Sequence, residues 1–291
     1  MTIDVAAAAE RIRPHVRRTP LWRVEVDGRP LALKLEHLQL TGSFKIRGAL
    51  NALIAKGTPD HVVTASGGNH GLGVAKAAQV LGVSATVFVP VSAPEGKVRR
   101  IEAAGAKLIR HGASYAEAAE AAREFPGTYV EAYNDPLTVS GQGTVGLEIV
   151  ADLPEVDAVA VAVGGGGLVA GIASAIDGRL TVGVEPVNCS ALHNALAAGT
   201  PVDGPVESVA ASALGATRLG ELPFEVLTST PVRSLLVTDT ALLAARDRLW
   251  EEFRLAVEPA AAVPFAAFLA GEVPGEVPCV VLCGANTDWT P

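Results

Sequence analysis

The chain has 291 residues, of which 49% are hydrophobic and 19% are charged, and its formal net charge is -8 at pH 7. Length and composition predict a compact protein with a large buried core, organised as one or two domains. The acidic balance argues against a nucleic-acid partner, because phosphate binding needs a concentrated basic surface. A small neutral or zwitterionic partner fits better.

The ends of the chain and its cysteines bear on the compartment. Asp4 lies in an N-terminal segment that has no basic stretch leading into an apolar one, so we do not expect a secretion signal. The glycine run 164–167 divides the apolar span 156–176 into a strand and a helix, which argues against a membrane helix. Three cysteines without CxxC spacing predict neither a disulfide framework nor a zinc site: Cys189, Cys279 and Cys283. We expect a cytoplasmic protein without a bound metal.

From about residue 31 onward, short β-prone runs alternate with Ala-rich segments of helical period, which predicts an α/β fold with parallel sheets. The predicted strands are Leu31–Lys34, Val62–Thr64, Ala85–Val89, Lys107–Ile109, Tyr129–Glu131, Ala158–Val163, Thr181–Val184, Ser234–Val237 and Cys279–Leu282. The predicted helices are Phe44–Ala55, Asn69–Leu81, Pro94–Ala104, Tyr115–Phe125, Gly141–Ala151, Leu168–Ile176, Thr240–Arg254 and Pro259–Ala270. The turn-rich segment AYNDPLTVSGQG suggests a boundary between lobes near Asp135.

The segment TGSFKIRGAL places Lys45 after a glycine turn, at the start of a helix and beside Phe44. A lysine in a first helical turn is most often solvated. A Schiff-base lysine is the alternative, because a positive helix end and an apolar neighbour both lower the pKa of an amine. This segment alone leaves both interpretations open and favours the first.

A second candidate is the loop TASGGNHGLGVA, which presents Ser66, Asn69 and His70 where a strand meets a helix. Such a loop directs backbone N–H groups at an anion. Helix capping by Ser66 or Asn69 would explain the loop equally well, and an isolated histidine is more often structural than catalytic.

The third candidate is the glycine run itself, in AVAVAVGGGGLVAGIA. Four glycines in a row cost conformational entropy and therefore need a reason. A phosphate-binding nest at the start of a helix would supply one, and close packing of the helix on the sheet is the alternative. The spacing is not the GxGxxG of a dinucleotide site. A fourth segment, VVLCGAN, contains Cys283, which alone would be assigned to the core.

Together these segments carry a resemblance that none of them carries alone. In order and spacing, SFKIRGA, SGGNHG, SGQGT, GGGG, EPA and CGAN resemble the fold type II pyridoxal-phosphate (PLP) enzymes, specifically the serine/threonine dehydratase (ammonia-lyase) family, over roughly residues 15 to 288. The resemblance implies two lobes as in the tryptophan synthase β subunit, each a mostly parallel sheet covered by helices. It also implies a large PLP-binding domain (1–37 and 138–291), a small substrate-loop domain (38–137) and a homodimer.

The resemblance implies a role for each matching residue. Lys45 would hold PLP as a Schiff base and later take the substrate Cα proton. Phe44 would lie against the pyridine ring. The remaining cofactor contacts would come from Asn69 to the 3′-oxygen, from Gly164, Gly165, Gly166 and Gly167 to the phosphate, and from Glu258 near the ring. The loop residues Ser66, Gly67, Gly68, Asn69 and His70 would bind the substrate, with its carboxylate at Ser66 and the backbone N–H groups.

Cys283 matches the position opposite the pyridine nitrogen. A thiol with a pKa of about 8 to 9 is a weak donor and does not force protonation of that nitrogen, so the ring is a weaker electron sink. This favours expulsion of a β-leaving group over transamination. The implied reaction converts a β-hydroxy amino acid, L-threonine or L-serine, into a 2-keto acid and ammonia.

Several alternatives remain. Related racemases carry a second serine where this chain has Gly67, which disfavours racemisation, and Ser212 stands where metal-binding members carry an aspartate. The chain ends soon after CGAN without the regulatory domain of biosynthetic threonine deaminases, which favours a catabolic role or another 3-hydroxy amino acid as substrate. β-Replacement, a catalytically silent PLP-binding homologue and a nucleotide-binding module are the other candidates.

Overall fold

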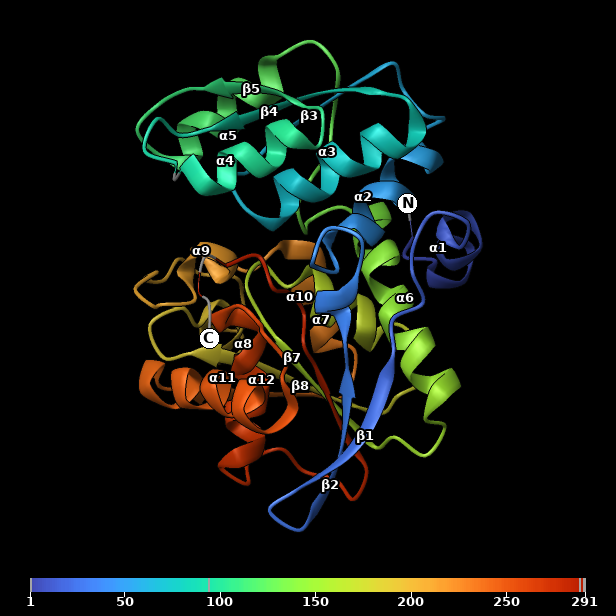
Figure 1. Cartoon of the computed structure of the whole chain (residues 1–291), viewed down its shortest axis with the longest axis vertical. Coiled ribbons are helices and arrows are strands. Elements are labelled where there is room, and N and C mark those ends of the chain that lie inside the picture. The colour runs from blue at the N-terminus through green and yellow to red at the C-terminus, as the bar shows by residue number, and fades with distance from the viewer. Residues whose placement is uncertain (1, 94, 288, 290–291) are drawn as a thin grey trace.

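The computed structural model describes residues 2–93, 95–287 and 289. It consists of two lobes, each built on one β-sheet, and it confirms the predicted α/β class with two mostly parallel sheets covered by helices. In Figure 1 the four-stranded lobe lies at the top and the six-stranded lobe at the bottom, with α2 (Lys45–Ala55) and α6 (Pro136–Asp152) where the two lobes meet.

The larger sheet has the strand order β1-β2-β10-β7-β8-β9. All neighbouring strands are parallel except the hairpin of the first two. The strands are β1 (Leu21–Val26), β2 (Arg29–Lys34), β7 (Ala158–Ala162), β8 (Leu180–Pro186), β9 (Val232–Val237) and β10 (Pro278–Val281).

Strand β1 is absent from the sequence-based prediction. It lies at the edge of the sheet, and only Val26 of its residues is buried. Because the exposed positions include charged residues, LWRVEV contains no apolar run that would indicate a strand. Its signal was the following Asp27-Gly28 pair, whose residues both have positive φ, +51° and +72°. Such a pair is typical of a two-residue hairpin turn.

The smaller sheet is entirely parallel, with the order β5-β4-β3-β6. Its strands are β3 (His61–Ala65), β4 (Ser84–Val89), β5 (Lys107–Arg110) and β6 (Thr128–Tyr129). All four agree with predicted strands to within a few residues at their ends.

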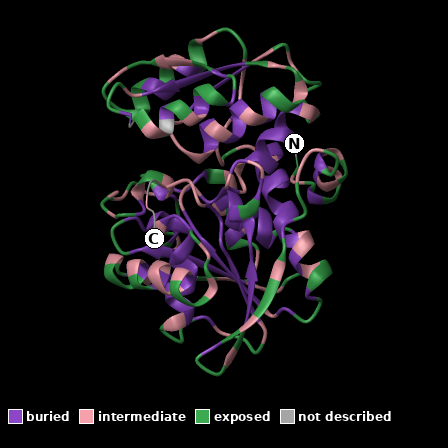
Figure 2. Cartoon of the chain, in the orientation of Figure 1, coloured by how far each residue is buried: buried purple, intermediate pink, exposed green. Residues whose placement is uncertain are grey.

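The other helices are α1 (Val5–Ile12), α3 (Asn69–Leu81), α4 (Glu95–Ala103), α5 (Tyr115–Glu124), α7 (Gly167–Ala173), α8 (Ala191–Ala198), α9 (Ala211–Leu214), α10 (Glu221–Thr228), α11 (Asp239–Phe253) and α12 (Pro259–Leu269), with a 3-10 turn η1 (Glu36–Leu38). Of these, α1, α8, α9 and α10 were not predicted. Residue 94, at the start of one predicted helix, lies outside the described residues. Figure 2 shows the buried positions concentrated on the two sheets and on the helix faces that cover them.

Helix α6 corrects the turn expected over AYNDPLTVSGQG. The helix begins at Pro136, because Asp135 accepts N–H bonds from Leu137 and Thr138 and so caps it. The glycines of SGQGT are helical, as predicted for Gly141–Ala151, and the helix extends five residues further towards the N-terminus than predicted. The suggested boundary near Asp135 coincides with the start of α6, and the predicted division at 137/138 falls inside this helix; that division remains a prediction.

The glycines of α6 let three helices approach closely. A Cβ at Gly141 would lie 2.5 Å from the Arg47 carbonyl oxygen in α2, and a Cβ at Gly143 would lie 2.6 Å from the Gly171 carbonyl oxygen in α7. Helix α6 thus packs directly against the helix that begins with Lys45 and the helix that begins with Gly167. This packing fixes the relative positions of two segments that are distant in the sequence.

Candidate active site

The predicted site segments meet at the carboxyl ends of parallel strands from both sheets. Lys45, Asn69 and Gly167 are the first residues of α2, α3 and α7, so three helix N-termini converge. In parallel α/β folds the carboxyl edge of the sheet is where ligands bind. The pocket between these helices has a volume of about 470 Å³ including the space at its mouth. Its lining includes Phe44, Lys45, Asn69, Tyr133, Gly164, Gly165, Gly166, Gly167, Leu214, Glu258 and Cys283.

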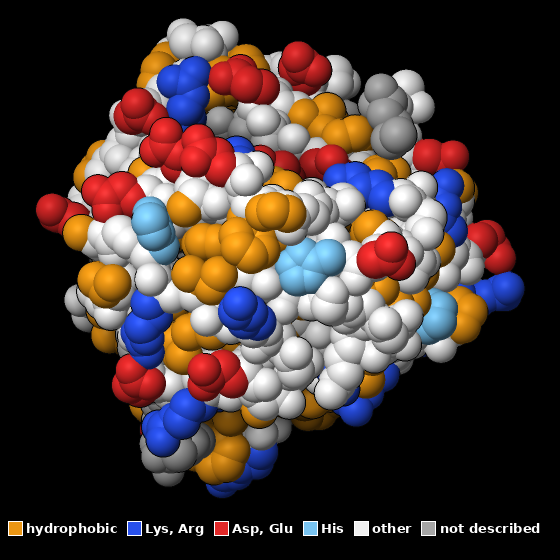
Figure 3. Space-filling view, turned by 90° about the horizontal axis from the view of Figure 1, so that it is seen from above, with side chains coloured by type: hydrophobic (Ala, Val, Ile, Leu, Met, Phe, Trp, Pro, Cys, Tyr) orange, Lys and Arg blue, Asp and Glu red, His pale blue; other side chains and the backbone are white. Residues whose placement is uncertain are grey.

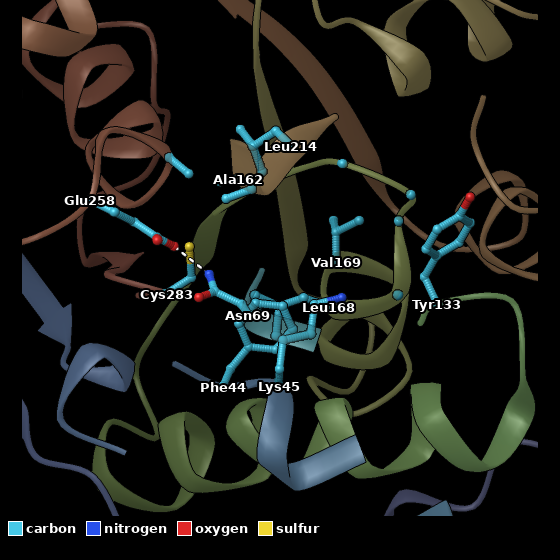
Figure 4. Close-up of a pocket in the computed structure, with 16 residues that line it drawn as sticks. Phe44, Lys45, Asn69, Tyr133, Ala162, Leu168, Val169, Leu214, Glu258 and Cys283 are labelled. Carbon is cyan, nitrogen blue, oxygen red and sulfur yellow. Dashed lines mark hydrogen bonds between the residues drawn. The ribbon is translucent and has the colours of Figure 1, made fainter. Parts of the chain in front are cut away.

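Lys45 points from α2 into this pocket (Figure 4). Its Nζ donates a hydrogen bond of 3.1 Å to the carbonyl oxygen of Ala132 and lies 5.2 Å from the centroid of the Phe44 ring. Burial of the amine lowers the pKa of Lys45 to about 8. A lysine in this state has a substantial neutral, nucleophilic fraction near neutral pH.

The glycine run forms one wall of the pocket, at the start of α7. Gly166 has φ of +93°, a conformation that favours glycine. A Cβ at Gly165 would overlap the ring of Tyr133, and one at Gly166 would lie 2.7 Å from Leu219. The run therefore contributes only backbone atoms to the pocket lining, with the Tyr133 ring packed beside it. Such a bare backbone at a helix N-terminus suits a phosphate group.

Asn69, Glu258 and Cys283 form the opposite wall (Figure 4). The Asn69 side-chain Nδ2 donates a hydrogen bond of 2.7 Å to the Glu258 carboxylate. Glu258 and Cys283 are each 4% exposed. Burial, together with the charge of Glu258, raises the pKa of the Cys283 thiol, so the thiol stays protonated at neutral pH.

The loop before α3 has two kinds of residue. Gly67, Gly68 and Asn69 line a smaller pocket next to the first one, while the Ser66 hydroxyl accepts a hydrogen bond of 3.2 Å from the Gly68 N–H. The ring of His70 is 5% exposed, and its Nε2 lies 3.1 Å from the Val130 carbonyl oxygen.

His70 lines neither pocket found among the described residues. Burial, together with the charge of Lys45, lowers the pKa of His70 to about 3, so the ring is neutral and its Nε2–H donates to Val130. This hydrogen bond anchors the start of α3 to Val130 without placing His70 in either pocket. Contact between His70 and a substrate remains a prediction.

Tyr133 and Asn286 are among the pocket residues that the sequence analysis did not identify. Tyr133 stands against the glycine run, and Asn286 donates a hydrogen bond of 2.7 Å to the Asn69 Oδ1. Asn286 belongs to CGAN, so this motif was a usable signal for it. Tyr133 lies in AYNDPL, which reads locally as a turn, and no pattern around it indicates a ligand.

These residues fit PLP on chemical grounds. A buried amine of lowered pKa, a wall of glycine backbone and a neutral thiol donor match the aldehyde, phosphate and ring nitrogen of this cofactor. Among the described residues there is no group of three or more His, Cys, Asp or Glu side chains placed to hold a metal ion.

Two surface properties bear on other partners. On the face seen in Figure 3, acidic and basic side chains are interspersed, without a continuous basic area. None of the helices in the described part of the chain is long and apolar enough to cross a membrane.

Comparison with known proteins gives consistent matches. The chain is 39% identical over 308 residues to an L-threonine ammonia-lyase of Geobacter sulfurreducens, covering 98% of this chain and 75% of the relative. It is 35% identical to a catabolic L-threonine dehydratase of Staphylococcus aureus, covering 93% of this chain and 83% of the relative. Both relatives are named for removing ammonia or water from L-threonine.

Two solved structures resemble the fold closely. A threonine deaminase from T.th. matches with a TM-score of 0.92 and 37% identity, covering 99% of this chain and 98% of that one. A maize serine racemase matches with a TM-score of 0.93 and 32% identity, covering 99% and 94%. Residues 12–284 match the family described as pyridoxal-phosphate dependent enzyme. On this evidence the chain belongs to the family of pyridoxal-phosphate dependent enzymes.

Proposed function

We propose that this chain is a PLP-dependent lyase that removes water from a β-hydroxy amino acid, L-threonine or L-serine, and yields a 2-keto acid and ammonia. The observation that carries this proposal is the buried Lys45 amine, with a pKa of about 8, in the same pocket as the glycine run and the Cys283 thiol. The relatives named as L-threonine ammonia-lyase and dehydratase support the substrate class.

Bound PLP supplies an electron sink for the pair of electrons left when the Cα–H bond breaks. The backbone N–H groups of residues 164–167 would hold its phosphate, Phe44 would lie against its ring, and Asn69 would donate to its 3′-oxygen. Cys283, kept protonated by burial, would face the ring nitrogen as a weak donor. Glu258 would lie near the ring and hold Asn69.

The substrate contacts would come from the loop before α3. Ser66 and the backbone N–H groups of Gly67 and Gly68 would bind the carboxylate, with His70 supporting the loop from behind. The amine of Lys45 would take the Cα proton, and the leaving hydroxyl would need a proton from a neighbouring acid. Holding the Cα–H bond near one amine converts proton transfer into an intramolecular step.

The test is to supply PLP-loaded protein with L-serine and L-threonine separately and to follow 2-keto acid formation. Lys45→Ala is the blank. Lys56→Ala is the matched control, because Lys56 caps the end of the same helix and its Nζ lies 3.4 Å from the Tyr129 carbonyl oxygen, outside the pocket. Keto acid formation by wild type and Lys56→Ala, and none by Lys45→Ala, would support the proposal.

Other outcomes separate the alternatives. If the protein binds PLP but converts neither substrate, three alternatives remain: a bulkier 3-hydroxy amino acid as the substrate, β-replacement, or a catalytically silent homologue. A panel of substrates and an added thiol nucleophile would distinguish these alternatives. D-Serine formed from L-serine would indicate a racemase.

We further propose that the protein is a homodimer and acts in the cytoplasm. Equilibrium sedimentation would test the oligomeric state, and cell fractionation would test the location.

A further inference from the structure

Asn69 has both ends of its side-chain amide engaged by the protein. Its Nδ2 donates 2.7 Å to the Glu258 carboxylate, and its Oδ1 accepts 2.7 Å from the Nδ2 of Asn286. The Asn286 Nδ2 also donates 2.8 Å to the main-chain carbonyl oxygen of Thr41. Three side chains from distant segments thus form one continuous chain of hydrogen bonds.

The direction of every bond in this chain is fixed by its ends. A carboxylate and a main-chain carbonyl can only accept, so Glu258 needs an N–H from Asn69 and Thr41 needs an N–H from Asn286. Once the Asn69 nitrogen faces Glu258, its oxygen must face Asn286. The opposite orientation of either amide would place two acceptors against each other.

The segment that carries Asn286 is held beside residues 41–43. The Ala285 N–H donates 2.8 Å to the Gly42 carbonyl oxygen, and Ser43 pairs with Gly284 in an isolated bridge. A Cβ at Gly42 would lie 3.1 Å from the Asn286 Oδ1, so the amide fits closely against this backbone. These backbone contacts, together with the bond to Thr41, fix the position of the Asn286 side chain beside Asn69.

We propose that Asn286 is a positioning residue that sets the amide orientation of Asn69 and so aims an N–H of Asn69 into the PLP pocket. An amide nitrogen carries two hydrogens, and Glu258 uses one of them. The other can serve an acceptor in the pocket that Asn69 lines, such as the 3′-oxygen of PLP. The inference rests on the proposed PLP function, but it concerns binding of the cofactor and not the reaction.

The test compares two substitutions of Asn286 by titrating apo-protein with PLP and recording the absorption of the bound cofactor. Asn286→Ala leaves the Asn69 oxygen without its donor, and we expect PLP affinity to fall roughly 3- to 10-fold. Asn286→Asp keeps the size of the side chain but places acceptors against Asn69 and Thr41. We expect this variant to bind PLP more weakly than Asn286→Ala and to shift the absorption band.

If Asn286 only filled space, the isosteric Asp would be the milder change, and that order of affinities would overturn the proposal. A double-mutant cycle gives a second check. In an Asn69→Ala background the effect of Asn286→Ala should disappear, because its target is gone. If Asn286→Ala reduced PLP affinity by the same factor in both backgrounds, Asn286 would not act through Asn69.

Asn51→Asp is the matched control for loss of a donor. The Asn51 Nδ2 donates 2.7 Å to the main-chain carbonyl oxygen of Leu137, and this side chain is buried away from the pocket. We expect this variant to be less stable yet to show the wild-type absorption of bound PLP. Because every readout is cofactor binding, failure of L-threonine and L-serine turnover would leave this test intact.

Discussion

The Nζ of Lys45 donates a hydrogen bond of 3.1 Å to the main-chain carbonyl oxygen of Ala132. Lys45 begins α2, whereas Ala132 lies between β6 and α6, so the bond joins segments 87 residues apart. The carbonyl can only accept, and it therefore orients the amine without taking its proton. Burial, which lowers the pKa of this amine to about 8, prepares it as a nucleophile.

The first prediction concerns the pH dependence of PLP capture by the apo-protein. Only the neutral amine attacks, so the rate should rise with pH and level off above about 8, the pKa of Lys45. At pH 7 roughly a tenth of the amine is already neutral, far more than for an ordinary lysine. Stopped-flow absorbance from pH 6 to 10 measures this profile, with N-acetyl-lysine as the reference. A plateau only above pH 10 would contradict the lowered pKa.

The second prediction separates two glycines of the phosphate wall. Gly165→Ala should weaken PLP binding because its Cβ meets the Tyr133 ring, and Tyr133→Ala should partly restore binding by removing that ring. Gly166→Ala should not be restored, since its φ of +93° strains any other residue. Overpacking of this kind costs about 1–3 kcal/mol. PLP titration and urea unfolding are measured for each glycine variant alone and for each combined with Tyr133→Ala. If Tyr133→Ala restored PLP binding equally in both glycine variants, the prediction would be wrong.

The third prediction concerns a buried ionic cluster beneath α2. Arg47 Nη2 lies 2.7 Å from Glu36 and Nη1 lies 2.7 Å from Glu148, which also pairs with Lys34 at 2.5 Å. Arg47→Met would leave the buried Glu36 carboxylate without its cation and Glu148 with Lys34 alone. We expect the free energy of unfolding to fall by about 3–5 kcal/mol.

Urea denaturation of apo-protein measures the Arg47 effect. The exposed pair of Arg218 and Glu221, 3.1 Å apart, supplies the control. Arg218→Ala should change stability by no more than about 1 kcal/mol, because exposed ion pairs contribute little. Similar losses at both sites would mean that the buried cluster contributes no more than a surface pair.

The fourth prediction is a pH effect on stability from Glu185. Burial raises the pKa of this carboxyl group to about 8, even though it accepts N–H bonds from Leu192 and His193. A raised pKa means that the fold prefers the protonated form, so its contribution is full below about pH 4.5 and is lost as pH rises towards 8. Glu185→Gln should therefore gain stability relative to wild type across that window. Thermal unfolding from pH 5 to 9 tests this, and a constant difference between the two proteins would argue against it.

The fifth prediction addresses racemisation. A Cβ at Gly67 would meet only Ala93 and Val89, both at 3.6 Å, so Gly67→Ser should fold normally. The serine would place a hydroxyl where the related racemases carry one. We expect D-serine formation from L-serine to rise above the wild-type level, measured by chiral chromatography, with Gly67→Ala as the control. Equal rates in the Ser and Ala variants would assign no role to the hydroxyl.

Sequence alone was sufficient for the fold class and identified most of the segments that meet at the pocket. Asn69 and Gly167 sit at strand-to-helix junctions that local periodicity marks, and the carboxyl ends of parallel strands necessarily share one edge of a sheet. The order of the motifs then linked Lys45 with Cys283, although these residues lie near opposite ends of the chain, and it indicated the family.

Tertiary structure decided what local patterns cannot encode. Tyr133 follows a short strand in a turn-like sequence, and only the packing of α6 against α2 and α7 brings its ring to the glycine run. The orientation of the Asn69 amide depends on acceptors contributed by Thr41 and Glu258, through bonds that span more than 180 residues. The pKa of Lys45 likewise depends on burial of its amine in the assembled pocket. Hydrogen-bond direction and desolvation are properties of the assembled pocket, so no segment of the sequence carries them by itself.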